Sequence, residues 1–306
     1  MKRIAALFLT AVFVLSLNTA SFAEGRKFGA CYITNSPFFT AVNDTIKAVL
    51  EVKGDTLITL DPERDLAKQI SQIKELIDQG IVALFLTPVD GEGITPALLA
   101  CKEAGIPVIN VDSAVRNEDL VASIIATDNL SAGRLCGEDL LHRIEGGKIA
   151  ILENSTAKTG LDRTTAFEDV IRKNSAFTIA ARGDSRGKRD TAEAVMKDII
   201  REVPDLAAVM CVSDSVALGA VEALKEAGAA GHVLVYGVNG SPEAKRAVKD
   251  GLMAATAGQS ARGIAHTAVG VAFDVLDGKK VEKLIGIPTL LITADNLHEF
   301  FLDGWQ

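Results

Sequence analysis

Cysteine and aromatic residues are scarce in this 306-residue chain, which has four cysteines, one tryptophan and an aromatic content of 5%. The cysteines lie far apart in apolar stretches, so their spacing matches neither a dense disulfide framework nor a CxxC metal motif. Cysteine is also among the residues most often buried. We therefore expect all four to be buried and reduced, although the sequence leaves disulfide pairing open: Cys31, Cys101, Cys136 and Cys211.

Basic runs and long apolar segments are missing as well. Lys and Arg number 32 against 40 Asp and Glu, which gives a formal net charge of −8. An acidic chain without a basic patch is a poor candidate for binding a phosphate backbone, so we expect no nucleic-acid partner. No segment reaches the roughly 20 consecutive apolar residues that a membrane-spanning helix needs.

Catalytic and phosphate-binding motifs are also absent. The chain contains no HExxH and no GxSxG, and its four histidines are scattered: His142, His232, His266 and His298. Residues 183–188 resemble part of a phosphate loop, but Arg189 stands where Ser or Thr should follow. We expect no enzymatic activity, no cofactor and no metal. The basic residues near this loop are interpreted as a solvated loop and helix start: Arg182, Arg186, Lys188 and Arg189.

The N-terminus has the pattern of an export signal. Lys2 and Arg3 precede an uncharged run over residues 4–17, and Ser21-Phe22-Ala23 supplies the small residues of a cleavage site. We expect residues 1–23 to be a signal peptide cut after Ala23, which leaves 30 basic and 40 acidic residues and a net charge of −10. The sequence thus predicts an exported protein, periplasmic in a cell with two membranes.

From residue 27 onward, short β-rich runs alternate with amphipathic helical patterns. Over residues 66–77, Leu66, Ile70, Ile73 and Ile77 recur at steps of four, three and four, which places them on one helix face. Near-continuous apolar strands between such helices predict an α/β fold with parallel sheets covered on both faces. The expected strands are 27–33, 55–60, 81–86, 106–111, 121–126, 148–152, 177–181, 207–212, 233–238 and 253–257.

A weak internal repeat points to one edge of the sheets. Residues 97–112 and 220–239 both read as a helix, a Lys-Glu-Ala-Gly turn, a buried strand and a final polar residue. The repeat makes Asp112 and Asn239 equivalent, each at the carboxyl end of a strand, although a loop acid and a turn residue are the plainer alternatives. In open parallel sheets this edge is where ligands bind.

Two adjacent aromatic residues, Phe38 and Phe39, follow the first expected strand. Ser36 is a suitable N-cap and Pro37 suits the first helical position, so both rings stand at the start of a helix. Consecutive side chains point in different directions, so both rings cannot face one core. We expect one ring to anchor the helix and at least one to lie in a ligand cleft.

Taken in order and spacing, several segments resemble the ribose-type periplasmic sugar-binding proteins of ABC transporters, over essentially the whole chain after residue 23. They are PFF (37–39), TPVD (87–90), GIPVINVD (105–112), IATDN (125–129), the Arg163-to-Phe167 segment, SDSVALGAVEALKEAG (213–228), YGVNGSPEAKRAV (236–248) and LMAATAGQ (252–259).

The resemblance implies two Rossmann-like α/β lobes joined by three crossovers, near Thr127-Asp128, Gln259-Ser260 and Leu290-Leu291. The first lobe would comprise residues 24–127 plus 260–290, and the second residues 128–259 plus 291–306. It also implies a monomer that shuts on a sugar by hinge closure, as this class does, and presents it to an ABC permease in the inner membrane.

By the same resemblance, eight residues are expected to contact the ligand: Ser36, Phe38, Phe39, Asp112, Arg163, Ser213, Asn239 and Gln259. The two rings would stack on a sugar face, while the carboxylate, guanidinium and amides would bond hydroxyl groups. Gln259 would also bond the hinge backbone. Asp214 is instead interpreted as a helix N-cap.

Four departures from the ribose pattern leave the ligand open. Ser36 replaces Asn, Ser113 replaces Arg, Asn239 replaces Asp, and Gly187 stands where an aromatic residue is expected. Ribose is therefore doubtful, and another monosaccharide, a deoxysugar or a polyol fits equally well. A transcriptional repressor of the same fold would need an N-terminal helix-turn-helix in place of the export signal. A sensor that presents a bound signal to a membrane receptor stays an alternative.

Overall fold

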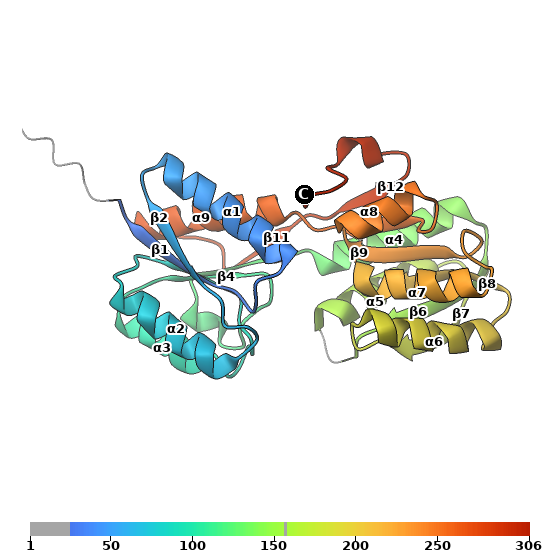
Figure 1. The fold of residues 1–306 in the computed structure, drawn as a ribbon, viewed down its shortest axis with the longest axis horizontal. Coiled ribbons are helices and arrows are strands. Elements are labelled where there is room, and N and C mark those ends of the chain that lie inside the picture. Colours follow the sequence, from blue (N-terminus) through green and yellow to red (C-terminus); the bar gives the residue numbers. More distant parts are fainter. Residues whose placement is uncertain (1–24, 156–157) are drawn as a thin grey trace, which may run out of the picture.

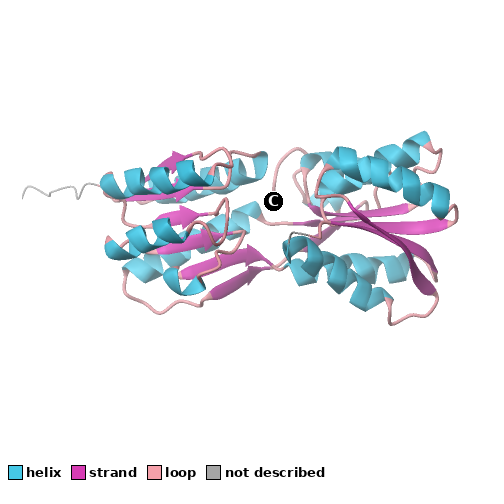
Figure 2. Cartoon of the chain, turned by 90° about the horizontal axis from the view of Figure 1, so that it is seen from below, coloured by secondary structure: helices cyan, strands magenta, loops and turns pink. Residues whose placement is uncertain are grey.

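The computed structural model describes residues 25–155 and 158–306, so the predicted signal peptide and its cleavage site lie outside the described residues. The chain forms two lobes that lie side by side, each built on one six-stranded sheet with helices on both faces (Figures 1 and 2). Among the described residues, no helix is long and apolar enough to cross a membrane.

The first lobe has an all-parallel sheet in the order β11-β5-β4-β3-β1-β2. Its strands are β1 (Lys27–Cys31), β2 (Thr56–Leu60), β3 (Leu84–Leu86), β4 (Val108–Val111), β5 (Ser123–Thr127) and β11 (Leu284–Ile287). One face packs against α1 (Pro37–Val52) and α9 (Ala261–Leu276), and the other against α2 (Leu66–Asp78) and α3 (Thr95–Glu103). A 3₁₀ turn, η1 (Glu118–Leu120), precedes β5.

The second lobe repeats this arrangement in the order β12-β10-β9-β8-β6-β7. Its strands are β6 (Gly147–Glu153), β7 (Phe177–Asp184), β8 (Leu206–Cys211), β9 (Leu234–Asn239), β10 (Ala255–Gly258) and β12 (Leu290–Thr293). One face packs against α4 (Asn129–Arg143) and α5 (Lys158–Ile171). The other face packs against α6 (Arg189–Glu202), α7 (Asp214–Glu226) and α8 (Pro242–Lys249), and η2 (Leu297–Glu299) follows the last strand.

The predicted fold class is confirmed, and each of the ten expected strands is present with ends shifted by a few residues. The sequence missed β11 and β12, because these four-residue edge strands are only partly buried and carry no long apolar run. The sheets are parallel as predicted except at β12, which the sequence did not indicate and which runs antiparallel to β10. This strand enters from the other lobe and so runs away from the cleft, whereas β10 runs toward it.

The chain passes between the sheets three times: at Asp128, at Gln259-Ser260 and at Pro288-Thr289. The third passage comes slightly before the predicted Leu290-Leu291, since Leu290 already begins β12 in the second sheet. Where the domain boundaries proper fall stays a prediction.

The two lobes are built as repeats of one topology. The strands β4 and β9 each stand third in their sheet, so the sequence repeat matched equivalent strands. Asp112 follows β4 directly and Asn239 is the last residue of β9. Both residues therefore stand at the carboxyl edge of their sheet, the edge that faces the other lobe.

Candidate functional site

A cavity of about 200 Å³ lies between the lobes and is lined from both sides. The first lobe contributes Ser36, Phe38, Phe39, Asp112 and Ser113, the second contributes Thr159, Arg163 and Asn239, the crossover contributes Gln259, and the C-terminal end contributes Trp305. The structure thus brings seven of the eight predicted residues around one space, and Ser213 is not among the lining residues described. That these residues bind a ligand stays a prediction.

The two phenylalanine rings divide between core and cleft. Ser36 is the N-cap of α1 and its hydroxyl accepts a hydrogen bond from the Phe39 N–H at 3.4 Å, while Pro37 is the first helical residue. The Phe39 ring is 8% exposed and stacks on Tyr32 with centroids 5.4 Å apart. Phe38 is half-buried and meets Phe39 edge to face at 5.3 Å. Phe39 anchors the helix, and Phe38 presents the more open aromatic surface to the cavity.

The two strand-end residues both have a positive φ, which non-glycine residues adopt rarely. Asp112 has a φ of 66°, in the left-handed region that Asn and Asp enter most readily, whereas Asn239 has a φ of 140°, outside that region. Such conformations carry a cost and cluster at ligand sites. Both side chains line the cavity.

The surroundings of the Asp112 carboxylate shift its pKa in opposite directions. Burial raises the pKa of Asp112, while the charge of Arg163 and a hydrogen bond from Ser113 act in the opposite direction. The Ser113 hydroxyl donates to Asp112 Oδ2 at 3.1 Å. The serine that replaces the arginine of the ribose pattern thus bonds the neighbouring acid.

Arg163 is held rigidly on α5. Its Nε donates to Asn129 Oδ1 at 2.7 Å and its Nη1 donates to the Val212 carbonyl at 2.8 Å. The side chain is 8% exposed. Burial lowers the pKa of Arg163, and the charges of Asp112 and Asp214 oppose that shift. Two of the five N–H groups of the guanidinium are used in these bonds, which leaves donors for a ligand hydroxyl.

A chain of side-chain hydrogen bonds spans the hinge. Asn239 Nδ2 donates to Gln259 Oε1 at 2.6 Å, and Gln259 Nε2 donates to Thr127 Oγ1 at 2.8 Å. The Gln259 side chain was expected to bond the hinge backbone, but it bonds the side chains of Asn239 and Thr127, and only its main-chain N–H bonds backbone, at the Asn239 carbonyl at 3.0 Å. The sequence missed Thr127, whose position at the end of β5 and beside a crossover was the available signal.

Ser213 and Asp214 differ from expectation. Ser213, not Asp214, is the N-cap of α7, so the predicted capping role of Asp214 is wrong. The buried Asp214 carboxylate instead accepts hydrogen bonds from Thr256 Oγ1 at 2.6 Å and from the Ser241 N–H at 2.7 Å. Burial raises the pKa of Asp214, against the effect of these bonds. The carboxylate ties the start of α7 to β10 and to the N-cap of α8.

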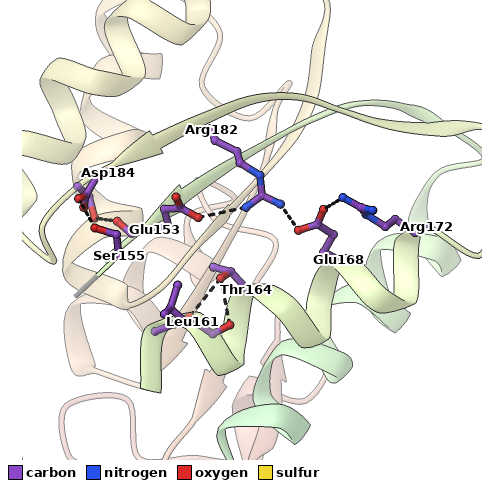
Figure 3. A network of polar contacts seen from close by, with 10 residues as sticks. Glu153, Ser155, Leu161, Thr164, Glu168, Arg172, Arg182 and Asp184 are labelled. Atoms are coloured by element: carbon purple, nitrogen blue, oxygen red, sulfur yellow. Dashed lines mark hydrogen bonds and ion pairs between the residues drawn. The ribbon is translucent and has the colours of Figure 1, made fainter. Parts of the chain in front are cut away.

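Ion pairs hold α5, and with it Arg163, against the second sheet (Figure 3). Arg182 on β7 pairs with Glu153 of β6 at 3.1 Å and with Glu168 of α5, and Glu168 also pairs with Arg172. Burial raises the pKa of Glu168, but the bonds from Arg182 and Arg172 outweigh it and hold the pKa below its ordinary value. Arg182 was expected in a loop, and its place on a strand corrects that.

A second hollow, of about 320 Å³, lies on the first lobe alone and is lined by residues that include Tyr32, Asn43 and Asp61. Because one lobe builds it, lobe closure would not enclose it, and the cavity between the lobes is the stronger candidate site. Within residues 25–155 and 158–306, no group of three or more His, Cys, Asp or Glu side chains is placed to hold a metal ion. All four cysteines are buried and unpaired, as expected.

Comparisons with known proteins show the family to which the chain is similar. Residues 30–280 match the family described as periplasmic binding protein domain. The ribose import binding protein of Salmonella typhimurium (strain LT2) is 31% identical over 286 residues, covering 92% of this chain and 95% of the relative.

Solved structures give the same picture. An ABC transporter solute binding protein from Mycobacterium smegmatis with bound glycerol is 32% identical, with a TM-score of 0.78 over 90% of this chain and 96% of that one. A periplasmic solute binding protein from Actinobacillus succinogenes 130z with bound D-allose has a TM-score of 0.82 at 22% identity, covering 90% of this chain and 100% of that one, which bears on the fold alone.

Proposed function

We propose that this chain, which belongs to the periplasmic binding protein family, is the solute-binding protein of an ABC importer and captures a small monosaccharide or polyol between its lobes. The observation that carries the proposal is the cavity of about 200 Å³, which takes residues from both lobes and combines aromatic rings with hydrogen-bonding groups.

The chemistry of the lining suits a polyhydroxylated ligand. Such a ligand has apolar C–H surfaces, which pack on aromatic rings, and hydroxyl groups, which pair with carboxylate, guanidinium and amide groups. Phe38 would cover a C–H surface, with Phe39 behind it. The hydroxyl groups would pair with Asp112, Arg163 and Asn239, with Gln259 at the hinge.

Binding would be coupled to closure of the lobes. A ligand that contacts Phe38 and Asp112 on one lobe and Arg163 on the other makes its full set of contacts only when the cleft is shut. That difference in affinity between open and shut states is what a ligand needs to shift the equilibrium. The bonded series Thr127–Gln259–Asn239 lies at the crossover, where such a motion would bend the chain.

The identity of the ligand depends on Ser36, Ser113 and Asn239, where the sequence differs from the ribose pattern. The relatives include a ribose import binding protein, and one structure holds glycerol, so both a sugar and a shorter polyol have precedent in the family. Because Ser113 bonds Asp112, the acid meets a neutral neighbour where the ribose pattern has a cation. This favours a ligand other than ribose.

Export, oligomeric state and partner are part of the same proposal. The chain would be cut after Ala23, act as a periplasmic monomer and dock its shut form on an ABC permease. The members of this family are binding proteins, which supports a role without catalysis.

A thermal-shift screen of pentoses, hexoses, deoxysugars and polyols tests the proposal. A ligand that binds only the folded state raises the melting temperature by mass action. We expect at least one member of these classes to stabilise the mature protein, with calorimetry giving 1:1 binding. Stabilisation by another metabolite class, and by no sugar or polyol, would show that the assigned ligand class is wrong.

A further inference from the structure

The last residues of the chain form a segment that touches both lobes. The C-terminal segment, residues 294–306, leaves β12 in the second lobe, and its end lies between the lobes in both views (Figures 1 and 2). On the first-lobe side, the Arg262 N–H of α9 donates to the main-chain oxygen of Gln306 at 3.0 Å. The segment therefore contacts the first lobe close to the Gln259-Ser260 crossover and ends at the cleft.

A buried lysine fixes this segment to the second lobe. The Lys245 side chain on α8 is fully buried, and its Nζ donates to the carbonyls of Phe301 and Gly304, the latter at 2.6 Å. A buried ammonium group is costly unless it is hydrogen-bonded, so these two carbonyls are a strong reason for the segment to stay in place. Trp305 directly follows the second of them.

Trp305 is the one tryptophan in the sequence, and it lies in the candidate site. Its ring meets Phe38 edge to face, with centroids 5.3 Å apart and planes at 75°. The lining residues described for the second lobe are polar, so the aromatic surface of the cavity comes from Phe38, Phe39 and Trp305. Phe38 and Trp305 thus form a corner of two rings, one from each end of the chain.

The indole N–H gives a second, independent indication. Trp305 Nε1 is buried and has no hydrogen-bond acceptor among the described residues. Unpaired buried donors are rare in folded proteins, because each loses its bond to water without replacement. Trp305 lines the cavity, but its Nε1 is shielded from solvent in this arrangement, so the donor reaches a ligand acceptor only when the ring shifts as the lobes close.

We propose that Trp305 is a ligand-binding and specificity-determining residue, which packs on a C–H surface of the bound sugar or polyol and donates its indole N–H to one ligand oxygen in the shut state. The inference rests on the proposed function and adds to it a contact from outside the two sheets. It requires the ligand to present an apolar edge and a hydroxyl group to the corner formed by Phe38 and Trp305.

Three variants and one ligand from the screen test the inference by calorimetry. Trp305→Phe keeps a ring against Phe38 and removes the N–H, and we expect affinity to fall about 2- to 10-fold, as for a neutral hydrogen bond. Trp305→Ala removes both contacts and should weaken binding about 10-fold or more. Phe301→Ala is the matched control. The exposed Phe301 ring stacks on Arg262, and the bond to Lys245 comes from the main-chain carbonyl, which the substitution keeps. This variant should bind within about 2-fold of the wild type.

The outcomes separate this inference from the proposed function. Wild-type affinity in both Trp305 variants would overturn the inference and leave the proposed function standing. Unchanged affinity in Trp305→Phe alone would refute the hydrogen bond. Equal losses in Trp305→Ala and Phe301→Ala would mean that the segment acts only as a support. A wild-type protein that binds no sugar or polyol would overturn both proposals.

Discussion

Replacing Arg163 by lysine keeps a positive charge in the cleft but removes the planar fork of donors. In the structure, the guanidinium divides its N–H groups between Asn129 Oδ1, the Val212 carbonyl and the cavity. A lysine ammonium has three donors on a single atom and cannot reach three separate directions in the same way. The substitution therefore tests whether the fork itself, and not only its charge, binds the ligand.

The loss of ligand affinity in Arg163→Lys follows from the number of hydrogen bonds lost. If lysine retains the contacts that hold the helix, at least one charge-assisted bond to a ligand hydroxyl is lost. Such a bond is worth about 1.5–3 kcal/mol, which corresponds to a Kd raised about 10- to 150-fold. Arg163→Ala should do more, because it also leaves the Val212 carbonyl without its donor and the charge of Asp112 without its counter-ion.

Calorimetric titration of both variants with the ligand from the screen measures this directly, and the melting temperature of the unliganded proteins separates binding from folding. Arg172→Lys is the matched control: it directly follows the same helix, pairs with Glu168, is largely exposed and is not among the residues that line the cavity. We expect the control to bind as the wild type does. If Arg163→Lys also binds with wild-type affinity, Arg163 makes no ligand contact and its role is confined to joining α5 to α4 and to Val212, the residue after β8.

Two further predictions concern titrating groups outside the ligand contacts. Because the pKa of Glu168 is held below its ordinary value of 4.5 by Arg182 and Arg172, the stability it contributes is present above about pH 4.5 and is lost as the pH falls through the folded-state pKa. In urea unfolding, Glu168→Gln should have a lower free energy of unfolding than the wild type at pH 7, and this free energy should fall less on acidification. A fall on acidification equal to that of the wild type would refute the prediction. Burial raises the pKa of the Cys31 and Cys101 thiols to about 12, so a thiol reagent at neutral pH should label no cysteine in the native protein and four in urea. Fewer than four labelled thiols in urea would mean that a disulfide has formed.

The residues that the sequence could predict share one property, which is that local patterns place them. Asp112 and Asn239 come at the ends of apolar strands, and Phe38 and Phe39 come at a capped helix start. These local sequence patterns already place the four residues at one edge of a parallel sheet. The predictions that failed concern residues whose contacts lie far away in the sequence. Asp214 has the sequence position of a cap, but its carboxylate bonds Thr256 and Ser241, far along the chain. No local pattern distinguishes the two outcomes.

Trp305 is the extreme case of such a distant contact. It lies 267 positions after Phe38, in a segment without long strands or helices, and neither residue alone indicates that the two rings meet. What brings them together is the third crossover, since β12 carries the chain back into the second lobe and Lys245 then directs the segment to the cleft. The crossovers therefore do more than join the lobes: they bring the two ends of the chain to one cavity, where a ring from each end can cover the same ligand.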